Sequence, residues 1–288
     1  MMASMTGFAR REATGTHGVL VCEIRSVNHR FLDPSLRLPD SCGGLEPTLR
    51  QTLSAELRRG KVDCTILHRP EAAGSATLDI DAATLKRLLD RARELATAAG
   101  PGARIDVLDL LRWPGVLRED TLDAEQFAAT VRELFAATLG DLKAARAREG
   151  ERLAALLRQR CAALAQLVEQ VVARVPEVHA RVRARIEERL AELGTEVNRE
   201  RLEQELVLLL QRLDVTEELD RLRGHLEETQ RVLGAPEPAG RRLDFLMQEF
   251  NREANTLSSK SQDLETTRAA VEMKVIIEQM REQVQNIE

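Results

Sequence analysis

The strongest constraint on the fold of this chain is a helical periodicity that begins near Ala124 and continues almost to residue 288. Leu, Ala and Val recur there at spacings of three and four residues, as on the buried face of an α-helix. Long helices of this kind pack along one another, so the pattern predicts an elongated arm of antiparallel helices. The composition agrees, because the apolar content is mostly Leu, Val and Ala, as in helical bundles.

Glycine and proline divide this region into expected helices. Gly140 favours a break, and Pro176 favours the start of a new helix or a kink. Gly150 allows either a kink or an uninterrupted helix, because an interior glycine costs only about 1 kcal/mol. The stretch Leu206–Leu210 is apolar all round, which predicts burial between neighbouring helices.

Four further helical segments are expected in the same region. They cover Val178–Leu193, Glu200–Leu213, Val215–Leu233 after a capping box from Asp214 to Glu217, and Leu264–Ile287 with a coiled-coil-like apolar seam. That last seam can face another helix of the chain or another subunit.

The first part of the chain alternates in the manner of strands. Ser4–Arg11, Gly18–Asn28 and Lys61–Arg69 have the period of two that predicts β-structure. Other elements are expected over Leu45–Leu57 (helix), Thr77–Ile80 (short strand), Asp81–Ala99 (helix) and Ile105–Leu111 (one or two helical turns), with Trp113 in the core. The predicted fold class is α+β. A small N-terminal strand–helix module covers 1–124, and a mainly helical region covers 125–288, with an arm to about residue 235 and C-terminal helices over 240–288.

One helix in this region carries more than a core pattern. Over Gly240–Gln262, the apolar face consists of Leu243, Leu246, Met247, Phe250, Ala254 and Leu257. A second stripe holds Asp244, Gln248, Asn251 and Asn255, and a third holds Glu249, Glu253, Thr256 and Lys260. Asn is a poor helix former, so its repeated use favours a binding role for the second stripe. The alternative is an ordinary solvated face.

Carboxylates on this helix are the first candidates for chemistry. Glu249 and Glu253 are four residues apart, so both can bind one magnesium or manganese ion through oxygen. Such an ion can activate water and neutralise a scissile phosphate. Asp244 lies well round the helix and would act only with partners from another segment. The alternative is an exposed acidic pair matched with Arg252 and Lys260.

A second candidate cluster lies earlier in the chain. Glu218, Arg221 and His225 share one helix face at spacings of three and four residues. His225 can ligate a metal or move a proton near neutral pH, and Glu218 can add a carboxylate ligand. The alternative is a solvated histidine on a charged helix.

The N-terminal module holds the only basic excess. Residues 1–70 carry ten Lys and Arg against seven Asp and Glu, whereas the whole chain has a net charge of −5. A nucleic-acid partner needs such focused positive charge. The candidate RNA contacts in this module are Arg25, Asn28, His29, Arg30 and Lys61. The alternative is a solvated sheet face with a cross-strand ion pair.

Other functional classes lack their sequence signatures. No Cys-x-x-Cys pair supports a zinc site, and the four cysteines are typical of reduced thiols in a cytoplasmic protein. We expect neither a signal peptide nor a membrane span, because no sufficiently long apolar run occurs. Few aromatics argue against base stacking on an aromatic surface. The absence of a nucleotide-binding glycine loop and of a hydrolase motif excludes only those familiar signatures. We expect no small-molecule organic cofactor.

Several long motifs resemble one known family. The C-terminal signature of the bacterial YicC/YloC proteins is similar to GRRLDFLMQEFNREANTLSSKSQDLE from Gly240 and to VEMKVIIEQMREQVQNIE at the end. The opening motifs of that family resemble SMTGFAR at Ser4–Arg10, EIRSVNHRFLD at Glu23–Asp33, RLP at Arg37–Pro39 and RGKVDC at Arg59–Cys64. The family pattern Arg-Leu-x-Ser-His has Gly224 in the serine position here, which removes any role for that hydroxyl.

The resemblance implies an endoribonuclease that uses a divalent cation and assembles as a ring-like hexamer. We therefore expect a cytoplasmic homo-oligomer that cleaves single-stranded or loop RNA, with Arg252, Asn255 and Lys260 as further RNA contacts. Three alternatives remain open: an RNA-binding adaptor that does not cut, a structural scaffold, and metal-free cleavage by the ribose 2′-hydroxyl assisted by His29 or His225.

Overall fold

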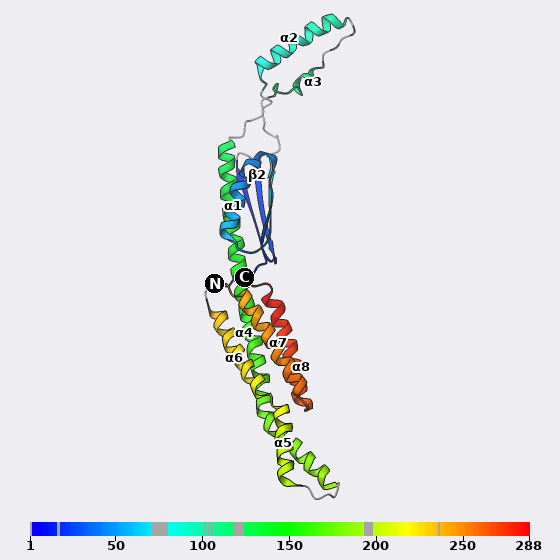
Figure 1. The fold of residues 1–288 in the computed structure, drawn as a ribbon. Coiled ribbons are helices and arrows are strands. Elements are labelled where there is room, and N and C mark those ends of the chain that lie inside the picture. Colours follow the sequence, from blue (N-terminus) through cyan, green and yellow to red (C-terminus); the bar gives the residue numbers. More distant parts are fainter. Residues whose placement is uncertain are drawn as a thin grey trace.

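The computed structural model describes residues 2–15, 18–70, 80–100, 102, 104, 106–117, 124–192, 198–235 and 237–288. The molecule is long and narrow (Figure 1). A helical tip, a sheet module, a helical bundle and a two-helix arm follow one another along its length. The predicted α+β class is confirmed.

The sheet module contains four strands in the order β1-β2-β4-β3. The alternating patterns predicted β1 (Gly7–Gly15), β2 (Gly18–Val27) and β4 (Gly60–Arg69) as strands, and β2 pairs antiparallel with both β1 and β4. The strand β3 (Leu32–Arg37) was not predicted, and it pairs parallel to β4 at the edge of the sheet. Its sequence lacks a clear alternation and contains Pro34, which an edge strand tolerates because one side of its backbone has no partner.

One face of the sheet forms the first hydrophobic core. The short 3-10 helix η1 (Asp40–Leu45) and helix α1 (Glu46–Glu56) cover it together with the first part of the long helix α4 (Ala124–Glu192). The predicted inward direction of Leu20, Cys22 and Ile24 is confirmed, because all three are buried in this core. The opposite face of the sheet, which carries Arg25 and Lys61, borders a groove of about 450 Å³.

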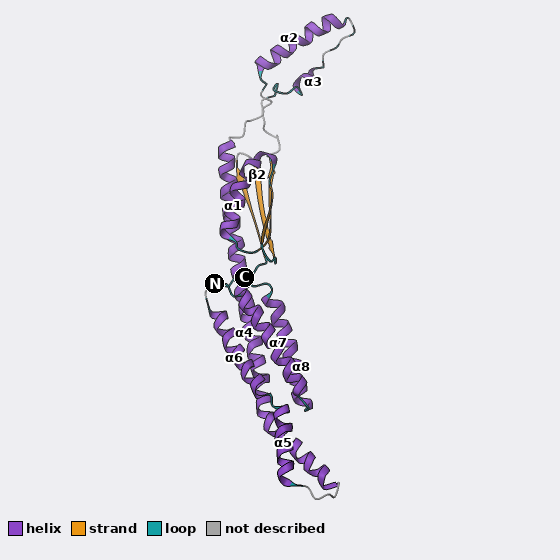
Figure 2. Ribbon diagram, viewed as in Figure 1, coloured by secondary structure: helices purple, strands orange, loops and turns teal. Residues whose placement is uncertain are grey.

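The helix α4 is 69 residues long and runs from the sheet module into the helical bundle (Figure 2). The predicted break at Gly140 and the predicted helix start after Pro176 are wrong, because α4 continues through both residues. At Gly150 the helix is also uninterrupted. There a Cβ atom would lie 2.4 Å from the carbonyl oxygen of Met2, so the glycine makes room for the N-terminal segment to cross α4. The domain boundary near residue 125 stays a prediction, since α4 contributes to both cores.

The second core lies in the helical bundle. The helices α6 (Thr216–Gly234), α7 (Gly240–Lys260) and α8 (Leu264–Val284) pack with the middle of α4. All six apolar residues predicted for α7 are buried, and the seam of α8 packs within the same chain. The predicted capping box does not form, because Val215 is the N-cap residue of α6. Asp214, just before it, accepts hydrogen bonds from the backbone and hydroxyl of Thr216, and Glu217 pairs with Arg221.

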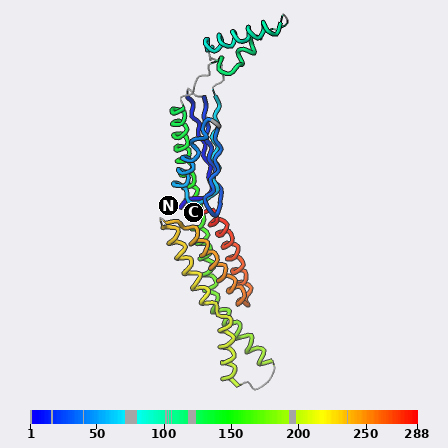
Figure 3. Tube along the Cα trace, turned by 45° about the horizontal axis from the view of Figure 1, so that its top comes forward, coloured from blue at the N-terminus to red at the C-terminus, as the bar shows by residue number. Residues whose placement is uncertain are grey.

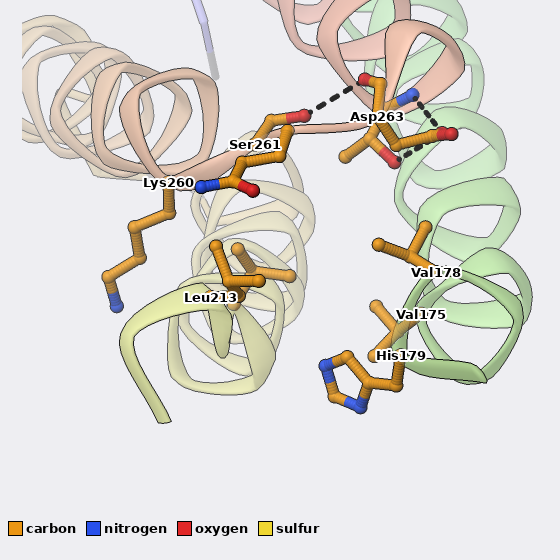
Figure 4. A pocket seen from close by; sticks show the side chains of 10 residues that line it. Val175, Val178, His179, Leu213, Lys260, Ser261 and Asp263 are labelled. Atoms are coloured by element: carbon orange, nitrogen blue, oxygen red, sulfur yellow. Dashed lines mark hydrogen bonds between the residues drawn. The ribbon is translucent and has the colours of Figure 1, made fainter. Parts of the chain in front are cut away.

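A sharp turn joins α7 to α8, and Asp263 organises it (Figure 4). The buried Asp263 carboxylate accepts hydrogen bonds from the backbone and hydroxyl of Thr266 and so caps α8. It also pairs with Arg174 at 2.7 Å and with Arg181 at 2.9 Å, which ties the turn to α4. The hydrogen bonds from Arg174 hold the pKa of this carboxyl far below its usual range.

The two ends of the molecule expose apolar side chains. Val207 and Leu208 are more than half exposed on α5 (Arg199–Leu213), so the predicted burial of Leu206–Leu210 is correct only in part, for Leu206. The reason is that α5 packs near only the end of α4, at the far end of the arm (Figure 1). At the other tip, beside α2 (Ala82–Ala99) and α3 (Val107–Leu111), Trp113 is 57% exposed and is not the predicted core residue. Thr77–Asp79 of the predicted short strand lie outside the described residues.

The two ends of the chain meet at the junction between sheet module and bundle (Figure 3). Ser4 forms a β-bridge with Ile287, and Arg146 of α4, buried beneath them, donates to the Ser4 carbonyl and pairs with Glu288. This junction fixes the sheet module against α7 and α8. In the described part of the chain, no helix has the length and apolar character needed to cross a membrane.

Candidate metal centre

Polar side chains form a ladder between the antiparallel helices α6 and α7. Three ion pairs run along it: Glu218 with Lys260 at 2.8 Å, Arg221 with Glu253 at 3.4 Å, and Glu228 with Arg242 at 2.5 Å. His225 lies between the last two, close to Glu249 and Glu253. The third stripe predicted for α7 thus faces α6, because the apolar face next to it packs into the bundle core. The candidate centre lies in the middle of this ladder.

Three potential metal ligands meet there. One ring nitrogen of His225 and one carboxylate oxygen from each of Glu249 and Glu253 lie within 4.8 Å of one another. The Glu253 side chain is only 3% exposed, whereas Glu249 remains partly accessible. A buried carboxylate without a compensating charge is costly, so Glu253 needs a cationic neighbour.

His225 has a restrained position and an unused ring atom. Its ring packs edge-on against Phe250, with centroids 5.7 Å apart. The Nε2 atom is buried and has no hydrogen-bond partner among the described residues. Buried ring nitrogens are normally satisfied, so an unpartnered one beside two carboxylates fits a missing ligand.

Arg221 orients the buried carboxylate. Its Nη1 atom lies 3.4 Å from Glu253 and its Nη2 atom donates to Glu217. The hydrogen bond to Glu253 is the main cause that raises the pKa of the Arg221 guanidinium, with the charge of Glu217 next. Arg221 therefore supplies part of the positive charge that Glu253 requires.

The donor set fits a divalent cation. Two carboxylates and one imidazole from two rigid helices leave other positions open for water or a phosphate oxygen. Oxygen-rich sets suit magnesium and manganese, and the imidazole favours manganese over magnesium. A cation held there would neutralise charge on a bound phosphate.

The structure does not bring Glu218 or Asp244 into this cluster. Glu218 pairs with Lys260, and its Oε2 atom is buried without a partner among the described residues. Asp244 accepts a hydrogen bond from Gln248 on a different side of α7. Of the RNA contacts predicted on α7, Arg252 lies 3.9 Å from Glu249, Asn255 donates to Asn251, and Lys260 also donates to the Asp214 carbonyl.

The N-terminal RNA contacts fall into two places. Arg25 and Lys61 lie on the open face of the sheet. Asn28 and Arg30 lie at the junction with the bundle, where Asn28 donates to the Gln285 carbonyl. His29 is exposed, and its Nδ1 atom contacts the Phe31 carbonyl at 3.0 Å. No pocket found among the described residues joins these groups directly to His225.

Three nearby residues escaped prediction as site residues. Arg59 and Arg241 line the junction pocket with Arg30, and Phe245 is 58% exposed on α7. A signal for two of them exists in the sequence, because Arg241, Phe245, Glu249 and Glu253 form one row at four-residue spacing. The sequence alone does not predict Arg59 as a site residue, because only the folded structure brings it beside Arg241 of α7.

Together the fold and the cluster define an elongated α+β protein with a carboxylate–histidine centre between two bundle helices. The chain belongs to the YicC-like endoribonuclease family. The model "Endoribonuclease YicC-like, N-terminal region" matches residues 2–155, and "Endoribonuclease YicC-like, C-terminal" matches residues 171–288.

Two relatives are similar over the full length of both chains. A "Probable endoribonuclease YicC" from Haemophilus influenzae is 41% identical over 288 residues, and a protein of the same description from Clostridioides difficile is 29% identical over 293 residues. The resemblance seen in the terminal motifs is therefore confirmed.

Proposed function

We propose that this protein is a metal-dependent endoribonuclease whose active centre consists of His225, Glu249 and Glu253. The observation that carries the proposal is the convergence of their three ligand atoms within 4.8 Å, with His225 Nε2 buried and unpartnered. The description of both relatives as probable endoribonucleases supports RNA as the substrate.

The protein residues divide the work of phosphodiester hydrolysis. A bound magnesium or manganese ion would neutralise charge on the phosphate and activate a water. Glu253 would hold the ion from a fixed position, because its carboxylate is buried and contacts Arg221. Glu249 is partly accessible, so it can also take up the proton of the attacking water. The water oxygen attacks phosphorus, the bond to the leaving ribose oxygen breaks, and that oxygen takes up a proton.

RNA reaches the centre along the exposed side of α7. Arg252 lies one turn from Glu249, and Asn255 and Asn251 present amides to solvent next to it. These groups can contact phosphate and ribose oxygens without reading a base. Arg25 and Lys61, on the open sheet face, are placed to hold a more distant part of the strand.

The test is gel cleavage of an end-labelled RNA with loops and single-stranded ends. The purified protein is assayed in EDTA, in magnesium and in manganese. Glu253→Gln, Glu249→Gln and His225→Gln are expected to reduce cleavage roughly hundredfold or more, because each removes one ligand. Glu272→Gln is the matched control, since Glu272 is exposed on α8, a helix that contributes no residue to the centre. Manganese binding gives a readout that does not depend on activity. It is measured as the loss of the free-ion signal in electron paramagnetic resonance.

The outcomes separate the alternatives. Cleavage that needs metal and all three residues supports the proposal. Cleavage that persists in EDTA but disappears in His225→Gln refutes the metal role and favours attack by the ribose 2′-hydroxyl. RNA binding with no cleavage in any metal favours an adaptor that delivers RNA to another nuclease. If the protein does not bind RNA even at low salt, where phosphate contacts are strongest, the structural-scaffold hypothesis is favoured.

We also propose that the protein works as a homo-oligomer, namely the hexamer that the resemblance of its motifs implies. Apolar side chains exposed at both ends of the molecule support subunit contacts, including Leu95, Val107 and Trp113 at one tip and Val207 and Leu208 on α5. Light scattering after size exclusion measures the subunit number. A monomer at micromolar concentration would contradict this part of the proposal.

A further inference from the structure

The two ends of the chain meet at the junction between the sheet module and the bundle (Figure 3). A polar pocket lies at this junction. Its volume is about 280 Å³. Three arginines from separate segments line it: Arg30 before β3, Arg59 before β4 and Arg241 in the first turn of α7. Asp244 is the one carboxylate in its lining.

The lining holds three arginines and one carboxylate, so the protein balances only part of the positive charge of this pocket. Among the residues that the structure describes, none of the three guanidinium groups forms an ion pair with a carboxylate. Asp244 accepts a hydrogen bond from Gln248 at 3.2 Å instead. Other arginines of the bundle are paired, for example Arg223 with Glu169 and Arg242 with Glu228. Three unpaired cations facing one small pocket favour an anionic ligand.

The pocket is also held in shape. Arg59 donates from Nε to the Arg30 carbonyl at 3.1 Å, which leaves its terminal nitrogens available. Asn28 donates to the Gln285 carbonyl at 2.7 Å and joins the sheet module to the end of α8. The Arg30 guanidinium lies 5.2 Å from the centre of the Phe31 ring. A preorganised pocket binds a small anion at little conformational cost.

One row of side chains on α7 connects this pocket to the candidate metal centre. Arg241, Phe245, Glu249 and Glu253 are four residues apart, so each lies just over one turn beyond the last and the row winds about 120° round the helix from Arg241 to Glu253. Arg241 and Glu249 are about 12 Å apart along the axis, at about 1.5 Å per residue. Between them, the Phe245 ring is 58% exposed. A solvent-exposed aromatic ring between a cationic pocket and a metal centre suits a nucleobase.

We infer that the junction pocket binds an internal phosphate of the RNA strand whose scissile bond lies at the metal centre, and that Phe245 stacks on a base between the two. This inference rests on the proposed function. A single strand fits this path, because stacking on Phe245 requires an unpaired base. The pocket positions the strand and takes no part in the chemical step.

Equilibrium binding tests the pocket without any cleavage. Fluorescence anisotropy of a labelled, unstructured RNA with a 5′-hydroxyl is measured in EDTA at several salt concentrations. Arg241→Gln and Arg59→Gln are each expected to weaken binding roughly tenfold. Each should also lower the slope of log affinity against log salt by about 0.7, the value for one phosphate contact to a single strand. Arg160→Gln is the control, because Arg160 is exposed on α4 without an ion pair in the described structure.

Phe245 has its own pair of variants. Phe245→Leu is expected to weaken binding roughly tenfold with an unchanged salt slope, because it removes stacking and no charge. Phe245→Trp should restore the affinity. A 2-aminopurine base near the middle of the RNA should be quenched on binding to the wild type and much less on binding to Phe245→Leu. Unchanged thermal unfolding shows that each variant is folded.

A neutral linkage locates the phosphate. A methylphosphonate replaces the phosphate at each linkage of the RNA in turn. At the linkage that contacts the pocket, the replacement should weaken binding to the wild type and should not weaken binding to Arg241→Gln any further. The inference is overturned if no position behaves in this way, if Arg160→Gln loses as much affinity as Arg241→Gln, or if a 5′-phosphate tightens binding only when Arg241 is present. If the arginine variants bind RNA more weakly but the wild type shows no metal-dependent cleavage, the proposed function is refuted and the phosphate-binding role of the pocket is supported. If the arginine variants bind RNA as tightly as the wild type and cleavage is normal, the proposed function is supported and the role of the pocket is refuted.

Discussion

The turn between α7 and α8 allows one interaction to be tested quantitatively. The Asp263 side chain is only 6% exposed and accepts hydrogen bonds from Arg174, Arg181 and Thr266. Asp263→Asn keeps an oxygen that can cap α8 but removes the charge. Hydrogen bonds to a charged group are worth about 1.5–3 kcal/mol, and Arg181 contributes little because it is 62% exposed. We expect Asp263→Asn to lower the free energy of unfolding by about 2–3 kcal/mol, and Asp263→Ala by about 1 kcal/mol more for the lost cap.

The same interaction predicts a dependence on pH. Arg174 holds the pKa of Asp263 well below the value of about 3.9 that it takes in the unfolded chain. The folded state therefore binds this proton less readily than the unfolded state. The stabilisation is complete above the unfolded pKa and is lost as the pH falls toward the folded pKa. The difference between the wild type and Asp263→Asn should thus shrink in acid.

Urea unfolding followed by far-UV circular dichroism measures both effects, at neutral pH and below about pH 4. Glu265→Gln is the matched control, because Glu265 lies in the same helix turn and pairs with Arg268 in solvent. Its expected effect is below about 1 kcal/mol. The reasoning fails if Asp263→Asn is no less stable than Glu265→Gln, or if its deficit is the same at both pH values.

Three other expectations follow from buried contacts. Gly150→Ala should destabilise the protein, because its Cβ would lie 2.4 Å from the Met2 carbonyl oxygen. Gly140→Ala in the same helix has open space around its Cβ and should stabilise the protein by about 0.5–1 kcal/mol. Thermal unfolding compares the two variants, and equal shifts in melting temperature would contradict this contrast. Lys260→Met leaves the Glu218 carboxylate buried without its cation and should lower the free energy of unfolding by about 2–3 kcal/mol. Adding Glu218→Gln to this variant should recover part of the lost stability. If the effects of the two substitutions are simply additive, the two side chains do not interact. Burial raises the pKa of the Cys161 thiol to about 11, so at neutral pH it should react with a disulfide reagent only after unfolding; rapid labelling of Cys161 in the native protein, located by mass spectrometry, would disprove its burial.

The sequence predicts the features that depend on a single element. The apolar face of α7 follows from a strict helical period, and so does the placement of Glu249 and Glu253 on the side next to it. The alternation of β2 gives the direction of Ile24 toward the core. In each case the spacing of residues along one helix or strand decides which side they occupy.

Features that depend on two elements were not predictable in the same way. Glu218 and His225 both face α7 from α6, and only the register between the antiparallel helices places His225 beside Glu253 and Glu218 beside Lys260. The edge strand β3 depends on its partner β4, because its own sequence lacks alternation. The exposure of Trp113 and Val207 reflects how few elements surround the two ends of the molecule. Tertiary context decides each of these features.

The bridge between Ser4 and Ile287 has a consequence for the order of events during synthesis. Domains usually fold as they emerge from the ribosome, the N-terminal one first. Here the segment around Ala3 cannot complete its contacts until residue 288 has emerged, since the backbone amide of Glu288 donates to the Ala3 carbonyl. In the interval Met2 and Met5, both buried in the finished protein, have no complete site to occupy. A nascent chain stalled short of its last turn would therefore expose its N-terminal segment to chaperones and proteases, and closure of the junction would mark the moment at which that exposure ends.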